Sequence, residues 1–387
     1  MCYTDPVRKH AHKTLRNMKI AAFICELNPL HEGHCHFISE ARRKTGADYL
    51  IALMSGDFVQ RGEPAVLPMH ERAEKALHAG ADLVLQLPDV YACASAQYFA
   101  EGGVRLLDSL NCVDALCFGA ECADGELLLK TVDQLNSFHE DMQPLIRKHL
   151  TEGMTYASAR SKALEDLLRE HEPALADQVS DLMRAPNNQL ALAYLQAMHS
   201  IHSSMTPCTV PRDPGFKSSS QIRRELFNDT SSASEDPYLI ADDFSLLLKD
   251  RLLRSDADAL SDYLDVTPDL AHRIKNKQNE FLSWSQFTDL LHTKEMTRAR
   301  ISRCLCHILL GIRKDDLSRD IRYLRILGFN RKAAPLLSYL KECSALPLIT
   351  KQDADQRDDA ADLYQSVLTD KYGIAFIESH EQPVRVI

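Results

Sequence analysis

The sequence has no long apolar run, and this absence argues against membrane insertion. No segment approaches the roughly 20 apolar residues that a transmembrane helix needs, and residues 1–17 lack the apolar core of a secretory signal. We therefore expect a cytoplasmic protein without membrane contact. A chain of 387 residues with 45% apolar content is long enough to bury a large core and to divide into two or three domains.

Cysteine pairs at metal-binding spacing are also missing. The chain has 11 cysteines but no CxxC pair, and most of them lie in apolar segments, which indicates reduced thiols in the core. Cys304, Cys306 and His307 form a compact CxCH group in a helical pattern, yet no second ligand cluster accompanies it. The sequence thus predicts no metal site built by protein side chains.

A positive net charge is absent as well. The formal charge of −10 argues weakly against a nucleic-acid partner. The distribution is uneven, however, because residues 249–342 carry 18 Lys and Arg against 13 Asp and Glu. This local excess, which includes the basic stretch KEMTRARISR at residues 294–303, favours a nucleic-acid contact in the C-terminal part of the chain.

The first 120 residues alternate short apolar runs with amphipathic segments. We expect helices at residues 33–44, 69–79 and 94–110. Buried strands are expected between them, at residues 19–25, 49–54, 82–87 and 115–118. This alternation is typical of a parallel α/β sheet, in which ligands bind at the carboxyl ends of the strands. The segments expected at that edge are residues 26–34, 55–64, 87–91 and 119–121.

Helical patterns dominate the remainder of the chain. We expect helices over residues 127–168 and 184–198, the second capped by Asn side chains that follow a Pro, and a last strand within residues 209–214. A serine-rich loop at residues 231–237 is the expected domain boundary. The predicted division is an N-terminal extension (residues 1–17), an α/β parallel-sheet domain (residues 18–235) and a mostly α-helical domain (residues 236–387).

The segment NPLHEGH, residues 28–34, directly follows the first predicted strand. Its two histidines, His31 and His34, could bind a metal, cap and pack a helix, or bind phosphate. In the last interpretation Gly33 lets a nucleotide approach the main chain, while helix-start amides and the imidazoles donate to its phosphates. The metal interpretation lacks a third ligand. Spacing alone leaves all three open.

Two motifs carry a resemblance to a known superfamily. NPLHEGH resembles the HxGH signature of the nucleotidylyltransferase superfamily, and SSSQIR, residues 218–223, resembles its second signature. The resemblance implies a Rossmann-like fold. A narrower resemblance, to the tRNA(Met) cytidine acetate ligase family, runs in order through ELNPLHEGH, MSGDFVQRGEPA, GADLVLQLP, CFGAE, PNNQLALAYL, TRARISRCLCHILLGI and YLRILGFN.

The narrower resemblance implies an activity. Members of that family activate acetate with ATP to acetyl-adenylate and then acetylate N4 of the wobble cytidine of elongator tRNA(Met), which yields N4-acetylcytidine, AMP and diphosphate. ATP would be a substrate, with Mg²⁺ bound to its phosphates. The sequence indicates no obligate protein partner. Two other functions stay open: a small-molecule adenylyltransferase of the same superfamily, and a non-catalytic RNA-binding protein with a nucleotide-binding fold.

The resemblance also implies site residues. His31, His34 and Arg223 would be catalytic. The expected ATP-binding residues are Ile24, Cys25, Glu26, Asn28, Pro29, His31, Gly33, His34, Phe37, Gly119, Asn187, Arg212, Ser218, Ser219 and Arg223.

Two further expectations concern the rest of the surface and the family pattern. Because they lie in the basic C-terminal region, the expected tRNA contacts are Lys294, Arg298, Arg300, Arg303, Arg325 and Arg331. The chain departs from the family pattern at Asp57, where Asn is usual, and at Leu27, where an aromatic residue is usual.

Overall fold

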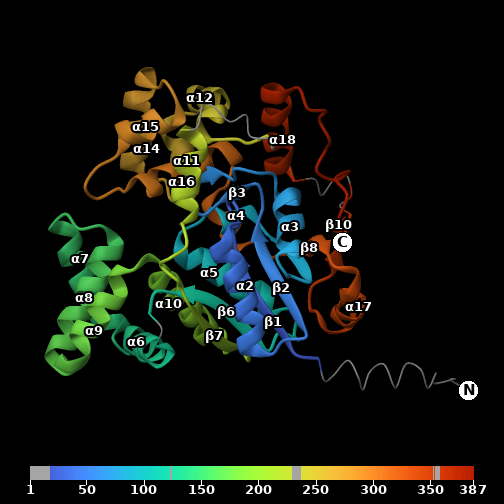
Figure 1. Ribbon diagram of the computed structural model, residues 1–387. Helices are drawn as coiled ribbons and strands as arrows, with labels where there is room; N and C mark the ends of the chain where they lie inside the picture. The colour runs from blue at the N-terminus through green and yellow to red at the C-terminus, as the bar shows by residue number, and fades with distance from the viewer. Residues whose placement is uncertain (1–17, 123, 229–236, 352, 354–357) are drawn as a thin grey trace, which may run out of the picture.

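The computed structural model describes residues 18–122, 124–228, 237–351, 353 and 358–387. The predicted N-terminal extension and nearly all of the predicted serine-rich boundary therefore lie outside the described residues. Figure 1 shows a central sheet with helices on both faces, a group of helices α6–α9 to one side and a second helical group above the sheet. No helix in the described part of the chain is both long and apolar enough to cross a membrane.

The sheet has eight strands in the order β10-β8-β5-β2-β1-β6-β7, with β9 also paired to β8. The run from β5 to β7 is parallel throughout, as the alternating pattern predicts. The bounds of the strands are β1 (Ile20–Cys25), β2 (Tyr49–Ser55), β5 (Leu83–Leu87), β6 (Ala115–Ala120), β7 (Thr206–Pro211), β8 (Leu324–Phe329), β9 (Leu348–Ile349) and β10 (Arg385–Val386).

Helices connect and cover these strands. Those before residue 229 are α2 (Glu32–Thr45), α3 (Met69–His78), α4 (Asp89–Ala92), α5 (Ala96–Asp108), α6 (Gly125–Ser137), α7 (His139–Thr151), α8 (Tyr156–His171), α9 (Pro173–Arg184), α10 (Pro186–Ser200) and α11 (Ser219–Asn228). Those after residue 236 are η1 (Ala241–Phe244), α12 (Ser245–Arg254), α13 (Ala257–Ser261), α14 (Pro268–Lys277), η2 (Gln278–Glu280), α15 (Trp284–Leu291), α16 (Arg298–Leu310), η3 (Lys314–Ser318), η4 (Arg331–Ala333), α17 (Ala334–Cys343) and α18 (Asp359–Tyr372).

The predicted fold class is confirmed, with one addition from the C-terminal part. Strand β8 runs antiparallel to β5, with Leu83 beside Phe329 and Leu85 beside Ile326. The sheet therefore continues past residue 235 and draws on both predicted domains. Whether the chain divides at that residue into two folding units stays a prediction.

A hairpin joins the sheet edge to a second core. It consists of β3 (Phe58–Val59) and β4 (Glu63–Pro64). Phe58 packs with Phe244 and Tyr364, with ring centroids 5.5 and 6.3 Å from its own, and the Tyr364 hydroxyl donates to the Ala65 carbonyl at 2.7 Å. Burial of these three rings fixes the loop after β2 against the C-terminal helices.

The same hairpin contacts α16 through its turn. Gly62 has φ +71°, and a Cβ there would lie only 2.3 Å from the Arg303 Cα, so the backbones of the turn and of α16 pack directly. The Ser302 hydroxyl donates to the Gly62 carbonyl at 2.7 Å and accepts from Trp284 Nε1 at 3.1 Å. A basic helix of the C-terminal part is thereby held next to the carboxyl edge of the parallel strands.

Candidate active site

The two histidines of NPLHEGH lie at the start of α2, directly after β1. His31 is the N-cap residue, and its Nδ1 accepts a hydrogen bond from the Gly33 N–H at 3.1 Å. Since Nδ1 accepts, neutral His31 carries its proton on Nε2, which is then a donor. The His31 and His34 rings stack with centroids 3.8 Å apart. His31 therefore caps α2, as the helix-cap interpretation expects.

Both imidazoles are held in the neutral form. Burial lowers the pKa of His34 to about 3, and the nearby His31 and the positive charge of Arg212 add to the effect. The pKa of His31 is lowered by burial and by Arg212. Among the described residues, the buried His34 Nδ1 has no hydrogen-bond partner. At pH 7 the pair is thus uncharged and has hydrogen-bonding capacity left for a ligand.

The absence of a side chain at Gly33 leaves room at the N-terminus of α2. A Cβ there would lie 3.0 Å from His31 Cε1 and 3.2 Å from the Cβ of Phe216, in the loop before α11. The small residue therefore lets two segments far apart in sequence meet at the first turn of α2. The positive end of a helix dipole lies at the helix N-terminus and favours an anion, so this turn suits a phosphate.

A second group of predicted residues gathers at the ends of β6 and β7. A Cβ built on Gly119 would lie 3.7 Å from the Arg212 side chain and 4.0 Å from the Phe37 ring, so these three positions adjoin one another. Arg212 is 4.0 Å from Glu121, and the Asn187 side chain donates to the same carboxylate. Arg212 is about half exposed and is thus available to a ligand.

Glu121 is a residue that the motifs did not single out. Its carboxylate accepts from the N–H groups of Asn187, at 3.4 Å, and Asn188, at 3.0 Å, and so caps the start of α10. The predicted Asn caps were wrong, because the N-cap residue is Ala185 and the Asn188 side chain accepts instead from the Cys122 N–H at 2.9 Å. The sequence signal for Glu121 was its place at the end of CFGAE, directly after a predicted strand.

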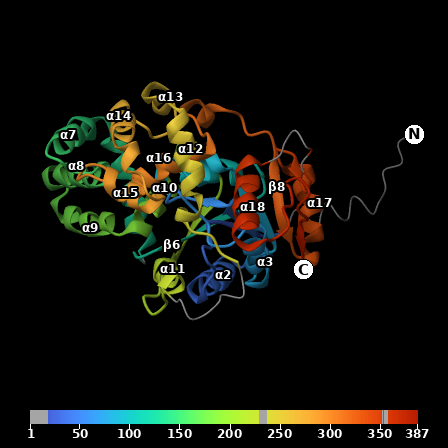
Figure 2. The same cartoon turned by 90° about the horizontal axis from the view of Figure 1, so that it is seen from above.

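The second signature forms the start of α11. Ser218 and Gln221 make a reciprocal cap: the Ser218 N–H donates to Gln221 Oε1 at 2.7 Å, and the Gln221 N–H donates to Ser218 Oγ at 3.3 Å. One turn on, the Arg223 guanidinium donates to the Asn28 carbonyl at 2.6 Å. Arg223 thereby links α11 to the first signature, 195 positions earlier in the chain. Figure 2 shows α11 beside α2.

A buried arginine, Arg72 of α3, holds the ends of the first two strands in place. It donates to the Glu26 carbonyl at 2.6 Å, to the Ser55 carbonyl at 3.2 Å and also to Gly56. Burial lowers its pKa. Sequence reasoning missed Arg72, although a lone arginine on the apolar face of a predicted helix was a usable signal.

Some residues expected at ATP serve the scaffold through their side chains. Asn28 is buried, and its Oδ1 accepts from the Val66 N–H at 2.7 Å. Glu26 Oε1 accepts from the Gln60 N–H at 2.8 Å. Ile24 packs on α5, where a Cβ at Gly103 would meet its Cδ1 at 2.5 Å. These positions leave mainly their main chain for a ligand.

The basic residues expected at tRNA do not form one surface. Arg325 contradicts the prediction, because its side chain is only 5% exposed and donates to the Ser379 carbonyl at 2.7 Å and to Gln86 at 3.3 Å. It fastens the C-terminal segment to the sheet. Arg331 follows β8, whose antiparallel direction puts it at the amino edge of the parallel strands, opposite the histidines.

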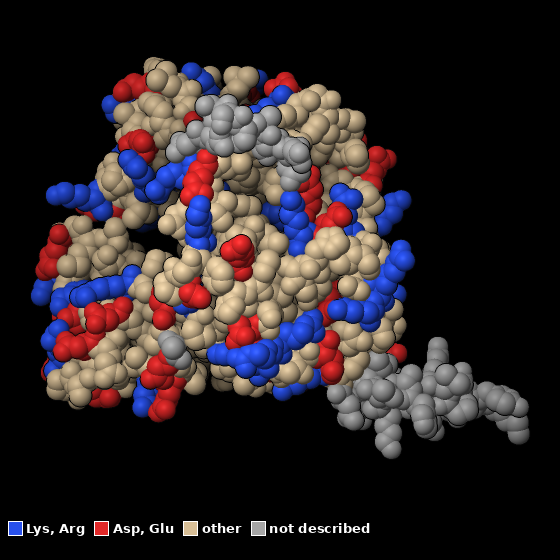
Figure 3. All heavy atoms as spheres, in the orientation of Figure 1, with Lys and Arg blue, Asp and Glu red and all other residues tan. Residues whose placement is uncertain are grey.

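The other four basic candidates belong to one region. Lys294, Arg298 and Arg300 lie before or within the first turn of α16, the helix that contacts the hairpin turn at Gly62. Arg303 is mostly buried, 3.7 Å from Asp265. Figure 3 shows basic side chains beside a hollow between the α7–α9 helices and the upper helical group. Contact of this region with RNA stays a prediction.

Metal binding gains no support from the geometry. No group of three His, Cys, Asp or Glu side chains within the described residues could hold a metal ion. His307 of the CxCH group approaches the carbonyls of Leu264 and Cys93 with its two ring nitrogens, at 2.8 and 3.0 Å, so neither nitrogen is left for a metal.

Burial raises the pKa of the Cys25 thiol, which keeps the thiol protonated and unreactive.

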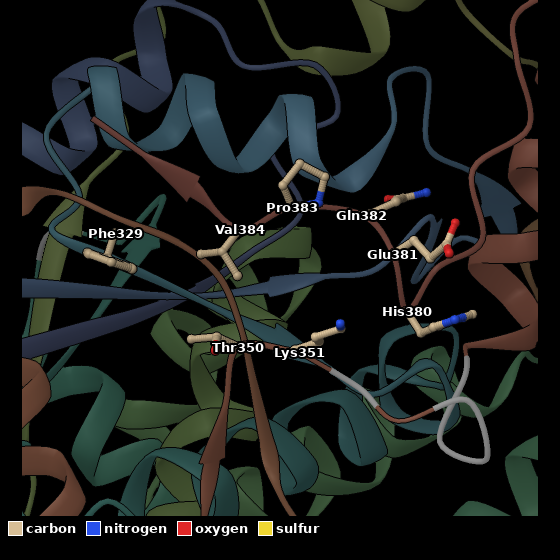
Figure 4. Close-up of a pocket in the computed structure, with 8 residues that line it drawn as sticks. All are labelled: Phe329, Thr350, Lys351, His380, Glu381, Gln382, Pro383 and Val384. Carbon is tan, nitrogen blue, oxygen red and sulfur yellow. The ribbon is translucent and has the colours of Figure 1, made fainter.

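A cavity of about 490 Å³ lies elsewhere, at the outer edge of β8. Figure 4 shows its lining residues, which are Phe329, Thr350, Lys351, His380, Glu381, Gln382, Pro383 and Val384. None of these belongs to either signature, so the cavity is no part of the candidate active site. That site is instead the open edge at the starts of α2 and α11.

Comparison with known proteins agrees with this geometry. The family model described as HIGH Nucleotidyl Transferase matches residues 18–383. A tRNA(Met) cytidine acetate ligase from Caldanaerobacter subterraneus subsp. tengcongensis is 34% identical over 395 residues, which cover 93% of this chain and 96% of that protein. The chain belongs to the tRNA(Met) cytidine acetate ligase family.

Other members of the family show the same relationship. The Acetivibrio thermocellus ligase is 31% identical over 86% of this chain and 88% of its own, and the Clostridium kluyveri ligase is 33% identical over 88% and 91%. The crystal structure of Thermotoga maritima TmcAL bound with alpha-thio ATP is 27% identical, with a TM-score of 0.80 over 93% of this chain and 90% of that one. The predicted membership in this family is thus confirmed.

Proposed function

We propose that this chain is an ATP-dependent ligase that acetylates N4 of the wobble cytidine in elongator tRNA(Met). The relatives named for that activity support the proposal. The observation that carries it is the contact between the two signatures, in which Arg223 of α11 donates to the Asn28 carbonyl just before α2. Two helix N-termini, two neutral imidazoles and two arginines thereby converge on one edge of the sheet.

The first step is the activation of acetate. A carboxylate oxygen of acetate attacks the α-phosphorus of ATP, the bond from that phosphorus to the bridging oxygen breaks, and diphosphate leaves. The enzyme has to bring two anions together and stabilise charge on the phosphate oxygens. Arg212 and Arg223 supply positive charge, His31 Nε2–H donates a hydrogen bond, and the positive end of the α2 dipole favours the phosphate oxygens.

The second step is acetyl transfer. The cytidine N4 attacks the carbonyl carbon of acetyl-adenylate, the bond from that carbon to the phosphate oxygen breaks, AMP leaves, and the amine loses a proton. No protein nucleophile is needed, which agrees with the protonated Cys25 thiol. The base must reach the site unpaired, so a loop of the RNA has to approach the edge at α2 and α11.

Magnesium would enter with the nucleotide. Since the described residues offer no cluster of metal ligands, the ion would be held chiefly by phosphate oxygens and water, as is usual for Mg²⁺ bound to ATP. It would neutralise charge on the departing diphosphate. Acetate would lie between the nucleotide and the approaching cytidine.

The test is the transfer of labelled acetate. The protein is incubated with labelled acetate, ATP and tRNA, and the RNA is digested and examined for N4-acetylcytidine. Label that enters RNA only when ATP is present supports the ligase. Acetate-dependent release of diphosphate without labelled RNA would favour a small-molecule adenylyltransferase, and neither reaction would favour a non-catalytic RNA-binding protein.

A further inference from the structure

An aromatic cluster lies just beyond the second signature. Phe227 at the end of α11 faces Tyr238, with ring centroids 6.0 Å apart and an interplanar angle of 24°. The Tyr372 hydroxyl donates to the Tyr238 carbonyl at 2.8 Å and accepts from its N–H at 3.3 Å. Phe227 and Tyr238, which are 11 positions apart, and the more distant Tyr372 therefore lie in one group, which we call the aromatic cluster (Phe227, Tyr238 and Tyr372).

The aromatic cluster is exposed and carries a cation. Phe227 and Tyr372 are each 40% exposed, which is unusual for rings that the fold has already brought together. The Lys371 ammonium lies 5.0 Å from the Tyr238 ring centroid and 5.3 Å from that of Tyr372, and it is fixed by Asp243 at 2.9 Å. The rings and the cation are thus held in position without being covered.

The position of the cluster relative to the active site follows from α11. Phe227 comes four residues after Arg223, which is about one helical turn or 6 Å along the axis, and it lies on the same side of the helix. Arg223 contacts the loop that contains the two histidines. The Phe227 position therefore lies about one helical turn from the contact that joins the two signatures.

We propose that Phe227, supported by Tyr238 and Tyr372, stacks on an unpaired base next to the target cytidine. This inference rests on the proposed function, which requires a single-stranded loop at this edge. Exposed aromatic rings beside a cation are the usual platform for unpaired bases, since every base has a flat face that can stack. The platform would place the neighbouring nucleotide while the cytidine enters the site.

Substitution at Phe227 tests whether the ring contributes to tRNA binding. Phe227→Leu keeps an apolar side chain of similar size but removes the ring, and we expect the KM for tRNA to rise by about 10-fold. Phe227→Tyr should stay within about twofold of the unaltered protein. The matched control is Tyr156→Leu, at the exposed start of α8, which should leave the KM for tRNA unchanged. Thermal unfolding curves check that each variant is folded.

A direct readout of stacking uses fluorescence. The chain has one tryptophan, Trp284, which is buried, so a Phe227→Trp variant adds an exposed indole to a constant background. Titration with an anticodon stem-loop RNA should quench the new emission, because a stacked base quenches an indole. The control Tyr156→Trp should show no quenching under the same conditions.

The outcomes separate this inference from the proposed function. Quenching at Phe227→Trp together with a raised KM in Phe227→Leu supports the platform. Acetyl transfer with an unchanged KM in Phe227→Leu and unquenched emission at saturating RNA would overturn it and leave the ligase intact. If the unaltered protein transfers no acetate to RNA, the proposed function fails, and the fluorescence titration still decides whether an RNA base stacks on Phe227.

Discussion

Replacement of Asp57 by Asn should stabilise the protein, and the gain should grow with pH. Asp57 is buried after β2, and its Oδ1 accepts from the Met69 N–H at 2.6 Å. Burial raises the pKa of Asp57 from its ordinary 3.8 to about 7, against the opposing charge of Arg72 and that hydrogen bond. The folded protein therefore favours the uncharged acid, and an amide would serve the same hydrogen bond without a charge.

The size of the effect follows from linkage. Between pH 3.8 and about 7 Asp57 is protonated in the folded chain but ionised in the unfolded chain. Because the folded state binds the extra proton, the free energy of unfolding falls as pH rises through this interval. Over that interval the cost reaches about 4 kcal/mol, at 1.36 kcal/mol for each pH unit. Water entry and relaxation around the ionised group reduce it, so about 4 kcal/mol is an upper bound for the gain in Asp57→Asn.

Neighbouring groups share this environment. Asp358 raises the pKa of Asp57 and Arg325 lowers it. Asp89 is half-buried, and desolvation, Asp358 and Asp57 together raise its pKa well above the ordinary range. Because Asp57→Asn removes one of these carboxylates, Asp89 ionises more readily in the variant.

The assay is thermal unfolding at a series of pH values. Between pH 4 and pH 8 the difference in Tm between Asp57→Asn and the unaltered protein should grow to several degrees and level off above pH 7. The exposed Asp370→Asn variant controls for the loss of one negative charge. A Tm difference that is the same at pH 5 and pH 8, or a destabilised Asp57→Asn at pH 8, would refute the reasoning.

Three further changes probe the site and its support. His34→Ala should abolish acetate-dependent exchange of diphosphate into ATP, because it removes the buried imidazole whose Nδ1 is unpaired among the described groups; retained exchange would contradict its role. Arg72→Lys should cost about 3 kcal/mol, seen as a lower urea midpoint, since one ammonium cannot replace a guanidinium bound to several carbonyls. Ser302→Ala should cost about 2 kcal/mol and alter the emission of the single tryptophan, because the Gly62 carbonyl and Trp284 N–H lose their partner; unchanged emission would show that the bond contributes little.

The parallel part of the sheet was predictable because each strand is a continuous apolar run. Residues 49–54, for instance, correspond to β2 (Tyr49–Ser55) and are buried on both faces, as parallel strands usually are. Strand β8 was missed because Arg325 interrupts its apolar run and because its partner β5 is some 240 residues away. Pairing at such a distance leaves no local signal.

The residues of the candidate site divide in the same way, into those that a local motif shows and those that only the folded structure shows. The two motifs located the histidines, Gly33 and Arg223, whose positions the structure brings together. Arg72 and Glu121 were missed because they act on main-chain groups, which every sequence contains, and only folding decides which carbonyls and amides are left to pair. Arg325 was misassigned because charge alone does not show whether a basic residue is exposed.

The antiparallel strand β8 has a consequence for engineering. It covers β5, whose sequence LVLQL is fully buried in the sheet. A fragment that ended near residue 235 would keep both signatures yet expose β5 as a flat, apolar edge with unpaired main-chain groups, which is the usual starting point for aggregation. Residues 18–235 alone should therefore not be soluble, because β8 is needed to pair with and cover that edge.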